Sequence, residues 1–196
     1  MPATASERGA TTRERLLRAA AELIPELGWG GVTTRKVAAR AGVRPGVVHY
    51  HFVSVSDLLS QTAVHVAREA LAESFRALDS APDVASGLDH LLATIDSYTH
   101  DDPAALVLTE SFLAATRDET LRLQLRDLFD EFRGQLAAWL RRHAAGTDTD
   151  ATAAVLAAAL DGVFLHRALD PSLSATPLRA PFERLVAAPA HKQETR

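Results

Sequence analysis

The side chains that could do chemistry in this sequence gather between Thr33 and Phe52. Val48 and Phe52 lie one helical turn apart, so both face the core side of a short helix that starts at Pro45. Packing against a core does not explain the other residues around this helix. A DNA major groove does, because the second helix of a helix-turn-helix lies in that groove. These outward residues are Arg44, Val47, His49, Tyr50 and His51.

The surrounding residues predict the two helices that would position these side chains. Thr33 or Thr34 can cap the first helix, because a hydroxyl there accepts a hydrogen bond from an orphan backbone N–H. Gly42 ends this helix, since glycine adopts the left-handed conformation without a steric penalty. Pro45 then starts the second helix, where its missing N–H costs nothing. The first helix has apolar residues at helical spacing, namely Val37, Ala38 and Ala41.

The segment from about Thr12 to Leu59, roughly a quarter of the chain, resembles the DNA-binding domain of TetR-type transcriptional regulators. That family has an Ala-Ala pair and a glycine, then T-x-x-x-[IV]-A-x-x-A-G-V, a turn, a helix that ends in His-Phe, and a fourth helix. The resemblance is specific, because many positions agree in order and spacing. The matching residues are Ala19-Ala20, Gly28, Thr33-Thr34, Val37-Ala38, Ala41-Gly42-Val43, His51-Phe52 and Leu58-Leu59.

Two positions depart from the family pattern. The family usually has tyrosine where this chain has His49, and lysine where it has Val55, in the first turn of the fourth helix. Both usual residues contact phosphates. A valine at position 55 neutralises no phosphate.

The resemblance also implies which residues contact DNA. Arg35 matches a position where the family commonly places a groove-reading side chain, and the fork of arginine pairs with both major-groove acceptors of guanine. The alternative is that Tyr50 and His51 brace the fourth helix while Arg35 and Lys36 are only solvated; for His51 both readings stay open. Family positions that face bases hold Arg44, Pro45, Gly46, Val47 and Tyr50, and Val47 could also contact a thymine methyl. Residues better placed for phosphates are Thr34, Lys36, His49 and His51.

The composition of the chain agrees with a DNA-binding domain followed by a second domain. The 196-residue chain has no cysteine and one methionine, which excludes disulfides and thiolate metal sites. It has neither a signal pattern nor a run of about eighteen apolar residues, so we expect a soluble, cytoplasmic protein without a membrane partner. The net charge is −4, but residues 1–60 hold eight Arg/Lys against five Asp/Glu, whereas the remainder holds thirteen against twenty. A basic end on an acidic body is typical of DNA-binding proteins.

Periodicity predicts an all-α chain of about nine helices. We expect residues 1–11 and 189–196 to be disordered, residues 12–56 to form a three-helix helix-turn-helix domain, and residues 57–188 to form a helical effector-binding and dimerisation domain. The capping box Thr11-x-x-Glu14 would start the first helix near Thr12, and Pro25 would kink it or end it early. The later helices are expected at about Asp57–Leu78 (capped by Ser54 or Ser56), Val84–Tyr98, Pro103–Thr116, Asp118–Ala144, Asp148–Leu169 and Leu178–Ala187.

The resemblance implies a small-molecule effector pocket among the fourth to seventh helices. Ordinary core packing explains each apolar candidate equally well by itself. No His/carboxylate pattern predicts a metal site, and we expect no cofactor. The candidate pocket residues are His65, Phe75, Leu91, Ile95, Phe112, Phe132 and Trp139.

An alanine-rich eighth helix permits the close approach of another helix. In the TetR-type family, helices 8 and 9 pair with those of a second subunit, and Leu160-Asp-Gly-Val-Phe-Leu-His-Arg167 resembles that eighth helix. The alternative is a helix buried within one subunit. The candidate dimer residues are Ala154, Ala157, Ala158, Leu160 and Phe164.

We therefore expect a homodimeric repressor that binds a palindromic DNA operator and is released by a small-molecule effector. A helical enzyme with a DNA-binding module is a weaker alternative, because there is no cysteine and no serine lies in a G-x-S-x-G motif. A nucleoid-type DNA binder without an effector is the other alternative, and sequence-independent binding would distinguish it.

Overall fold

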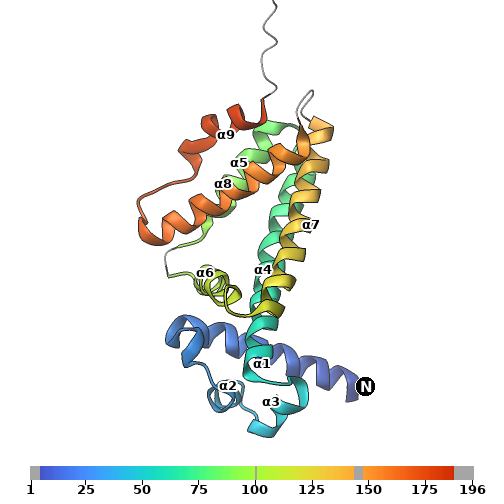
Figure 1. The fold of residues 1–196 in the computed structure, drawn as a ribbon, viewed down its shortest axis with the longest axis vertical. Coiled ribbons are helices and arrows are strands. Elements are labelled where there is room, and N and C mark those ends of the chain that lie inside the picture. The colour runs from blue at the N-terminus through green and yellow to red at the C-terminus, as the bar shows by residue number, and fades with distance from the viewer. Residues whose placement is uncertain (1–4, 100, 144–147, 188–196) are drawn as a thin grey trace, which may run out of the picture. The chain divides into compact units, whose positions relative to one another are not determined.

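The computed structural model describes residues 5–99, 101–143 and 148–187, and within these ranges the chain forms helices and connections without a strand (Figure 1). The expected all-α fold with nine α-helices is confirmed for this part of the chain. Two short 3-10 helices, η1 and η2, add to them. The elements are α1 (Ala5–Leu27), η1 (Trp29–Gly31), α2 (Thr34–Arg40), α3 (Pro45–His51), α4 (Val55–Ser80), α5 (Val84–Ser97), α6 (Pro103–Ala115), α7 (Glu119–His143), α8 (Thr149–Leu169), η2 (Thr176–Leu178) and α9 (Arg179–Val186).

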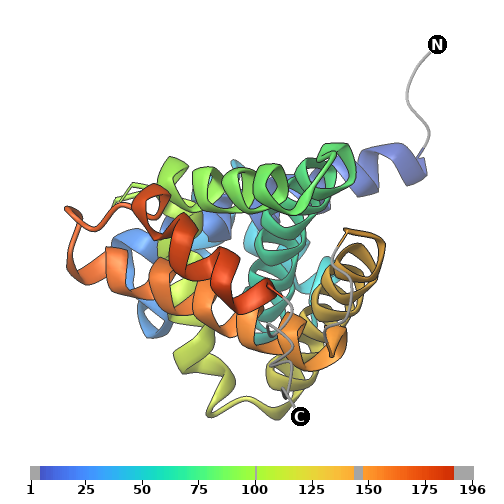
Figure 2. The same ribbon diagram turned by 90° about the horizontal axis from the view of Figure 1, so that it is seen from above.

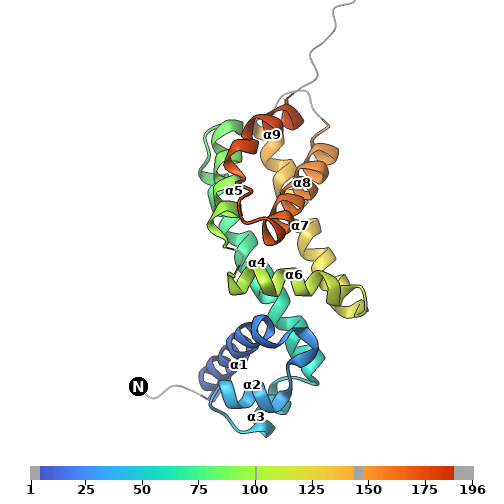
Figure 3. The same ribbon diagram turned by 90° about the vertical axis from the view of Figure 1, so that its left-hand side faces the viewer.

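The first compact unit comprises Met1–Glu69 and Asp101–Asp127. In it α1 packs on α2 and α6, and α2 packs on α3, as Figure 3 shows for α1–α3. The unit thus extends beyond the helix-turn-helix domain expected over residues 12–56, because α6 contributes to the same core. That core includes Leu16, Leu23, Ile24, Val37, Val48, Phe52, Leu58, Leu59 and Val107.

The second compact unit comprises Ala70–His100 and Leu128–Arg196. Within it α5 packs on α8 and α9, and α8 packs on α9 (Figure 2). Trp139 lies fully buried against Gly87, where an added Cβ would come within 2.1 Å of the indole ring. A glycine at position 87 is therefore what allows α5 to approach the Trp139 ring. The surrounding core includes Leu88, Leu92, Phe132, Leu136, Leu140, Leu156, Leu160 and Phe182.

The start of α1 differs from the expectation. The helix begins at Ala5, so the expected start at the Thr11-x-x-Glu14 capping box is wrong, as is disorder for Ala5–Thr11. Alanine, glutamate and arginine in this stretch favour helix, and the helix therefore continues past the capping signal. The expected end of the seventh helix at Ala144 and the expected tail 189–196 lie outside the described residues.

Of the two effects expected at Pro25, a kink or an early end of the helix, the early end does not occur. Pro25 lies inside α1, which continues to Leu27. Leu23 and Ile24 are buried in the core of the first unit, and the Gly28 amide closes the last turn on the Ile24 carbonyl at 2.9 Å. This packing holds the helix together despite the hydrogen bond that proline cannot donate.

Candidate nucleic-acid interface

The turn between α2 and α3 depends on a threonine cap and on the left-handed backbone of Gly42. Thr33 caps α2, and its Oγ1 accepts from the Lys36 amide at 3.4 Å. Gly42 has a φ of 66°, a left-handed value that the sequence predicted. The amide of Val43 donates to the Ala38 carbonyl at 2.9 Å, and that of Gly42 donates to Ala39 at 3.2 Å. These two bonds form a Schellman motif, which ends α2 and directs the chain into α3.

The α3 helix buries one side and leaves the rest in solvent. Val48 and the following Phe52 are buried, as the spacing predicted, while Tyr50 is 84% exposed. Tyr50 therefore does not brace α4, which leaves its ring available for a groove. Among the other predicted contact residues, Arg44, Pro45, Gly46 and His49 are exposed, and Val47 and His51 are partly buried.

His51 lies between two aromatic rings. Its ring meets Tyr50 edge-on with centroids 5.1 Å apart, and its centroid lies 6.4 Å from that of Phe52. The Phe52 ring also contacts α1, because the Arg13 guanidinium carbon lies over it, 5.5 Å from the ring centroid. His51 thus packs along α3 and still retains a partly exposed ring.

The cations of this region divide into two groups. Arg40 pairs with Glu22 and Glu26 of α1 at 3.2 and 2.7 Å, so it holds α2 to α1. Lys36 donates to the Gly31 carbonyl at 2.8 Å at an exposed site. Arg35 and Arg44 are exposed, and no ion pair engages either of them within the described residues. Both guanidinium groups are therefore available to an external partner.

The start of α4 is held by a reciprocal set of hydrogen bonds. Ser54, one of the two expected caps, accepts from the Asp57 amide at 3.0 Å. Asp57 in turn accepts from the Val53 amide at 3.0 Å and from the Gln61 side chain at 2.7 Å. This arrangement fixes the turn that follows α3. It also presents Val53, which is 93% exposed and which the sequence reasoning missed.

Val55, where the family usually has lysine, is partly buried against the core of the first unit. The core of the first unit therefore shields part of this side chain from solvent.

Residues of α6 and the start of α7 support the interface from within the same unit. Glu110 accepts from the Trp29 amide at 3.3 Å, which fixes the turn after α1. Asp118 accepts from Ser56 at 3.0 Å and caps α7 through the Leu121 amide at 3.0 Å. The contacts of Glu110 with Trp29 and of Asp118 with Ser56 join residues far apart in the chain, so no local sequence signal predicted them.

The candidate pocket residues fall into both compact units. In the first unit, His65 is exposed and lies 3.5 Å from Glu69, and Phe112 is partly buried. In the second unit the structure brings five candidates together in one core, with the Phe75 and Phe132 ring centroids 5.4 Å apart. The indole N–H of Trp139 has no hydrogen-bond partner in the described part of the chain. The five are Phe75, Leu91, Ile95, Phe132 and Trp139.

The candidate dimer residues also divide. Ala157 and Leu160 lie in the core of the second unit, and Phe164 packs against that core. Ala154 and Ala158 are exposed on the other side of α8. Helical spacing alone did not distinguish these two sides, because both carry small or apolar residues.

The α3 helix is exposed and follows a turn that contains a left-handed glycine. Arg35 in α2 and Arg44 directly before α3 are not engaged in ion pairs in the described residues. These features define a helix-turn-helix DNA-binding protein. Residues 16–62 match the family described as "Bacterial regulatory proteins, tetR family". Residues 82–190 match the description "Tetracyclin repressor-like, C-terminal domain". The chain belongs to the TetR family of transcriptional regulators.

Relatives agree with this assignment. An uncharacterized HTH-type transcriptional regulator of Mycobacterium tuberculosis is 28% identical over 136 residues, 69% of either chain. The HTH-type transcriptional regulator BetI of Pseudomonas aeruginosa is 27% identical over 161 residues, 80% of this chain and 81% of BetI.

Solved structures share the fold. A regulator of Streptomyces coelicolor A3(2) superposes with a TM-score of 0.73 and 28% identity, covering 89% of this chain and 98% of its own. One from Pseudomonas aeruginosa PAO1 has a TM-score of 0.77 and 24% identity, covering 89% and 88%. One from Saccharomonospora viridis, solved in complex with choline, has a TM-score of 0.74 and 21% identity, covering 90% and 96%.

Proposed function

We propose that this regulator is a repressor that binds a palindromic operator as a homodimer and leaves it when a small-molecule effector binds. The observation that carries the DNA part is the exposed surface of α2 and α3, where Arg35 and Arg44 are outside any ion pair in the described residues and Tyr50 is 84% exposed. Within the described residues no ion pair engages either arginine, and the Tyr50 ring contacts His51 but stays largely in solvent, which favours an external partner. Action on DNA also places the protein in the cytoplasm.

In this proposal base reading falls to the exposed side chains of Arg35, Arg44 and Tyr50 and to the partly buried Val47. Arg35 and Arg44 can each present a planar fork to guanine, and the Tyr50 ring and the Val47 methyls can contact thymine or the sugar edge. Thr34, Lys36, His49 and His51 are assigned to phosphates, which position the protein without reading sequence. Pro45 and Gly46 add little bulk at the start of α3, which favours close approach to the groove.

The proposed dimer uses the exposed sides of α8 and α9. Among the described helices, only α8 is long and apolar enough to cross a membrane, but Ala153, Leu156, Ala157 and Leu160 bury one side of it in a protein core. A second copy of this chain covers the other side in the proposal, because a two-fold operator requires a two-fold protein. The exposed residues include Ala151, Ala154, Val155 and Ala158 of α8, Leu169 at its end, and Leu185 of α9.

The proposed effector enters the second unit near its aromatic core. The buried Trp139 N–H lacks a partner in the described residues, and an effector with a hydrogen-bond acceptor would satisfy it. The choline complex of the S. viridis neighbour supports a small molecule in this fold. Release from DNA would follow from a population shift, limited by the difference in the effector's affinity for the two states.

Selection of bound genomic fragments tests the proposal. The purified protein should enrich a small set of fragments that share one palindrome with two half-sites about one helical turn apart. A variant with Arg35→Ala and Arg44→Ala together should lose that enrichment while it keeps its melting temperature. Enrichment of fragments without a common sequence would indicate a nucleoid-type binder and reject the operator.

A further inference from the structure

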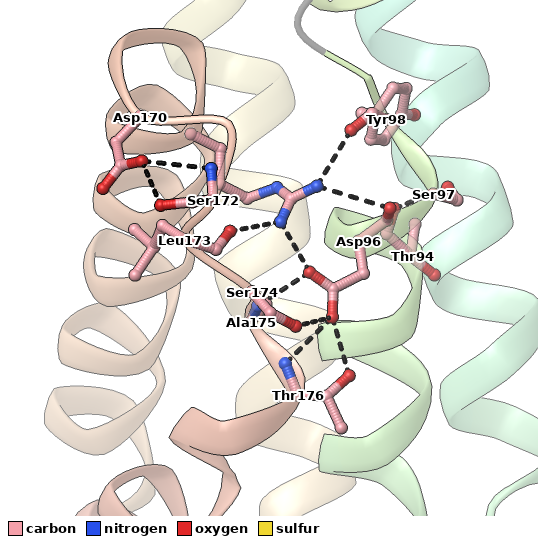
Figure 4. Close-up of polar contacts among 11 residues, drawn as sticks. Thr94, Asp96, Ser97, Tyr98, Asp170, Ser172, Leu173, Ser174, Ala175 and Thr176 are labelled. Atoms are coloured by element: carbon pink, nitrogen blue, oxygen red, sulfur yellow. Dashed lines mark hydrogen bonds and ion pairs between the residues drawn. The ribbon is translucent and has the colours of Figure 1, made fainter.

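The connection between α8 and α9 is closed onto the end of α5 by two charged side chains (Figure 4). Asp96, in the last turn of α5, accepts from Nη1 of Arg167, near the end of α8, at 2.8 Å. The Arg167 and Asp96 side chains are only 15% and 22% exposed. Neither residue belongs to the DNA interface or to the candidate pocket.

Asp96 is saturated as a hydrogen-bond acceptor. Beside Arg167, its Oδ1 accepts from the Ala175 amide at 2.7 Å. Its Oδ2 accepts from Ser174 Oγ at 3.0 Å, from the Thr176 amide at 2.9 Å and from Thr176 Oγ1 at 2.6 Å. Burial alone would raise the pKa of Asp96, but the hydrogen bonds from Thr176, Ala175 and Ser174 outweigh it and lower that pKa to about 2. The carboxylate is therefore ionised across the neutral range.

Arg167 holds the other components of this cluster. Its Nη2 donates to the Tyr98 carbonyl at 3.1 Å and to the Asp96 carbonyl at 3.4 Å, both at the C-terminal end of α5. The last carbonyls of a helix lack internal partners and favour a cation, so Arg167 caps α5. Its Nη1 also donates to the Leu173 carbonyl in the connection. One guanidinium thus joins the ends of α5 and α8 to the chain between α8 and α9.

The connection itself is short and ordered. It begins with a turn in which Asp170 accepts from the Ser172 amide at 3.0 Å and from Ser172 Oγ at 2.6 Å. It ends at Ala175, which is fully buried in the core of the second unit. Because Arg167 and Asp96 hold both parts of this connection on α5, α9 is constrained relative to α8.

We propose that Asp96 and Arg167 are positioning residues for dimerisation, which hold α8 and α9 so that their exposed apolar side chains form one surface for a second copy of this chain. The inference rests on the proposed dimeric function. Leu169, 87% exposed, follows Arg167 by less than one turn at the end of α8, the part of the helix that the pair holds on α5. Leu185 of α9 lies beyond the connection, and its place relative to Val155 of α8 depends on the same pair.

Sedimentation equilibrium of the full-length chain tests the inference. Arg167→Lys keeps the positive charge but cannot span Asp96, Tyr98 and Leu173 together, and it should raise the dimer dissociation constant at least about ten-fold, equivalent to about 1.4 kcal/mol. Asp96→Ala should do the same. The matched control is Asp89→Asn, which breaks another α5–α9 ion pair, to Arg179 at 2.9 Å, whose side chains are 44% and 43% exposed. That control should change the dissociation constant by less than about two-fold.

Circular dichroism at the working temperature checks that each variant is folded. If Asp96→Ala unfolds, the dimer dissociation constants of Arg167→Lys and Thr176→Val test the inference in its place. Thr176→Val removes one hydroxyl donor to Asp96. A folded Arg167→Lys dimer as tight as the wild type, with faster amide exchange across residues 170–176, would overturn the inference, because the cluster would then open without consequence. A monomeric wild type would instead overturn the proposed dimer, and the inference with it.

Discussion

At the scale of single residues, the structure separates arginines that hold the fold from arginines that remain for DNA. Arg40 is paired with two glutamates and Arg15 donates to the Ala41 carbonyl, so both stabilise the helix-turn-helix. Arg35 and Arg44 have no such role among the described residues. The family resemblance predicted DNA contacts for Arg35 and Arg44, whereas the roles of Arg15 and Arg40 are visible only in the tertiary structure.

Arg35→Ala tests base reading. It should cost about 1–3 kcal/mol on the operator and relax the preference at one base pair in each half-site, because a bidentate contact to guanine is lost. Lys36→Ala is the matched control and should weaken operator and random DNA alike, since phosphate contacts do not read sequence. Fluorescence anisotropy with a set of single-base operator variants measures both. Equal losses for Arg35→Ala on every sequence would contradict base reading.

Asp161 gives a pH-dependent prediction. Burial in α8 raises its pKa to about 6, against the opposing charge of Arg133 on α7. A raised acid pKa means that the folded state binds the proton more tightly, so Asp161 costs stability as pH rises from about 4 to about 6, and the cost persists above that. Asp161→Asn should therefore stabilise the fold by roughly 1–3 kcal/mol at pH 7.5 and bring no gain at pH 4. Thermal melts at the two pH values measure this; a lower melting temperature of Asp161→Asn at pH 7.5 would show that attraction to the Arg133 charge outweighs the cost of burial.

At the scale of elements, the approach of α5 to α7 depends on Gly87. A methyl at this position would overlap the buried Trp139 ring, so Gly87→Ala should destabilise the fold by about 1–3 kcal/mol. Gly134→Ala is the matched control: its Cβ would meet nothing within 4 Å on an exposed site of α7, and it should stabilise by roughly 0.5–1 kcal/mol. Denaturant unfolding followed by tryptophan fluorescence compares them. Equal changes in the free energy of unfolding for the two variants would mean that the α5–α7 packing adjusts to the added methyl group.

The first turn of α4 gives a second element-scale prediction. Val55→Lys should add a phosphate contact and steepen the slope of log K against log salt by roughly 1.8 per dimer, because each contact on duplex DNA contributes about −0.9. Since Val55 is partly buried, we also expect a lower melting temperature, with the lysine stem retaining part of the packing. Val53→Lys, at a 93% exposed site in the preceding turn, is the comparison that adds charge without that loss of packing. An unchanged slope for Val55→Lys would show that no DNA strand passes this turn.

Local signals were enough to predict most elements of the fold. Thr33, Gly42, Pro45 and Ser54 act through neighbours in sequence, and each acts as its residue type predicted. The predicted start of α1 was wrong, because residues with helix propensity extend the helix past the capping box towards the N-terminus. Contacts such as Glu110 to Trp29 could not be predicted, since they join residues far apart in the chain.

At the scale of the whole molecule, operator binding depends on a dimer. Ala158→Arg, on the exposed side of α8, should give monomers and at least a hundred-fold weaker operator binding, since two linked half-sites then act separately. Ala157→Arg is unsuitable, because Ala157 lies in the protomer's own core. Gln135→Arg, at an exposed site on α7, controls for the added charge. Sedimentation velocity and anisotropy measure the two effects; a monomeric variant that binds the operator as tightly as the wild type would contradict the role of the dimer.

A stoichiometric titration of the selected palindrome tests most directly whether the protein binds one DNA sequence as a homodimer. The wild-type protein should saturate the duplex at two chains for one palindrome. It should bind random DNA of the same length at least about a thousand-fold more weakly at physiological salt. Saturation at one chain, or equal affinity for the palindrome and random DNA, would contradict the account.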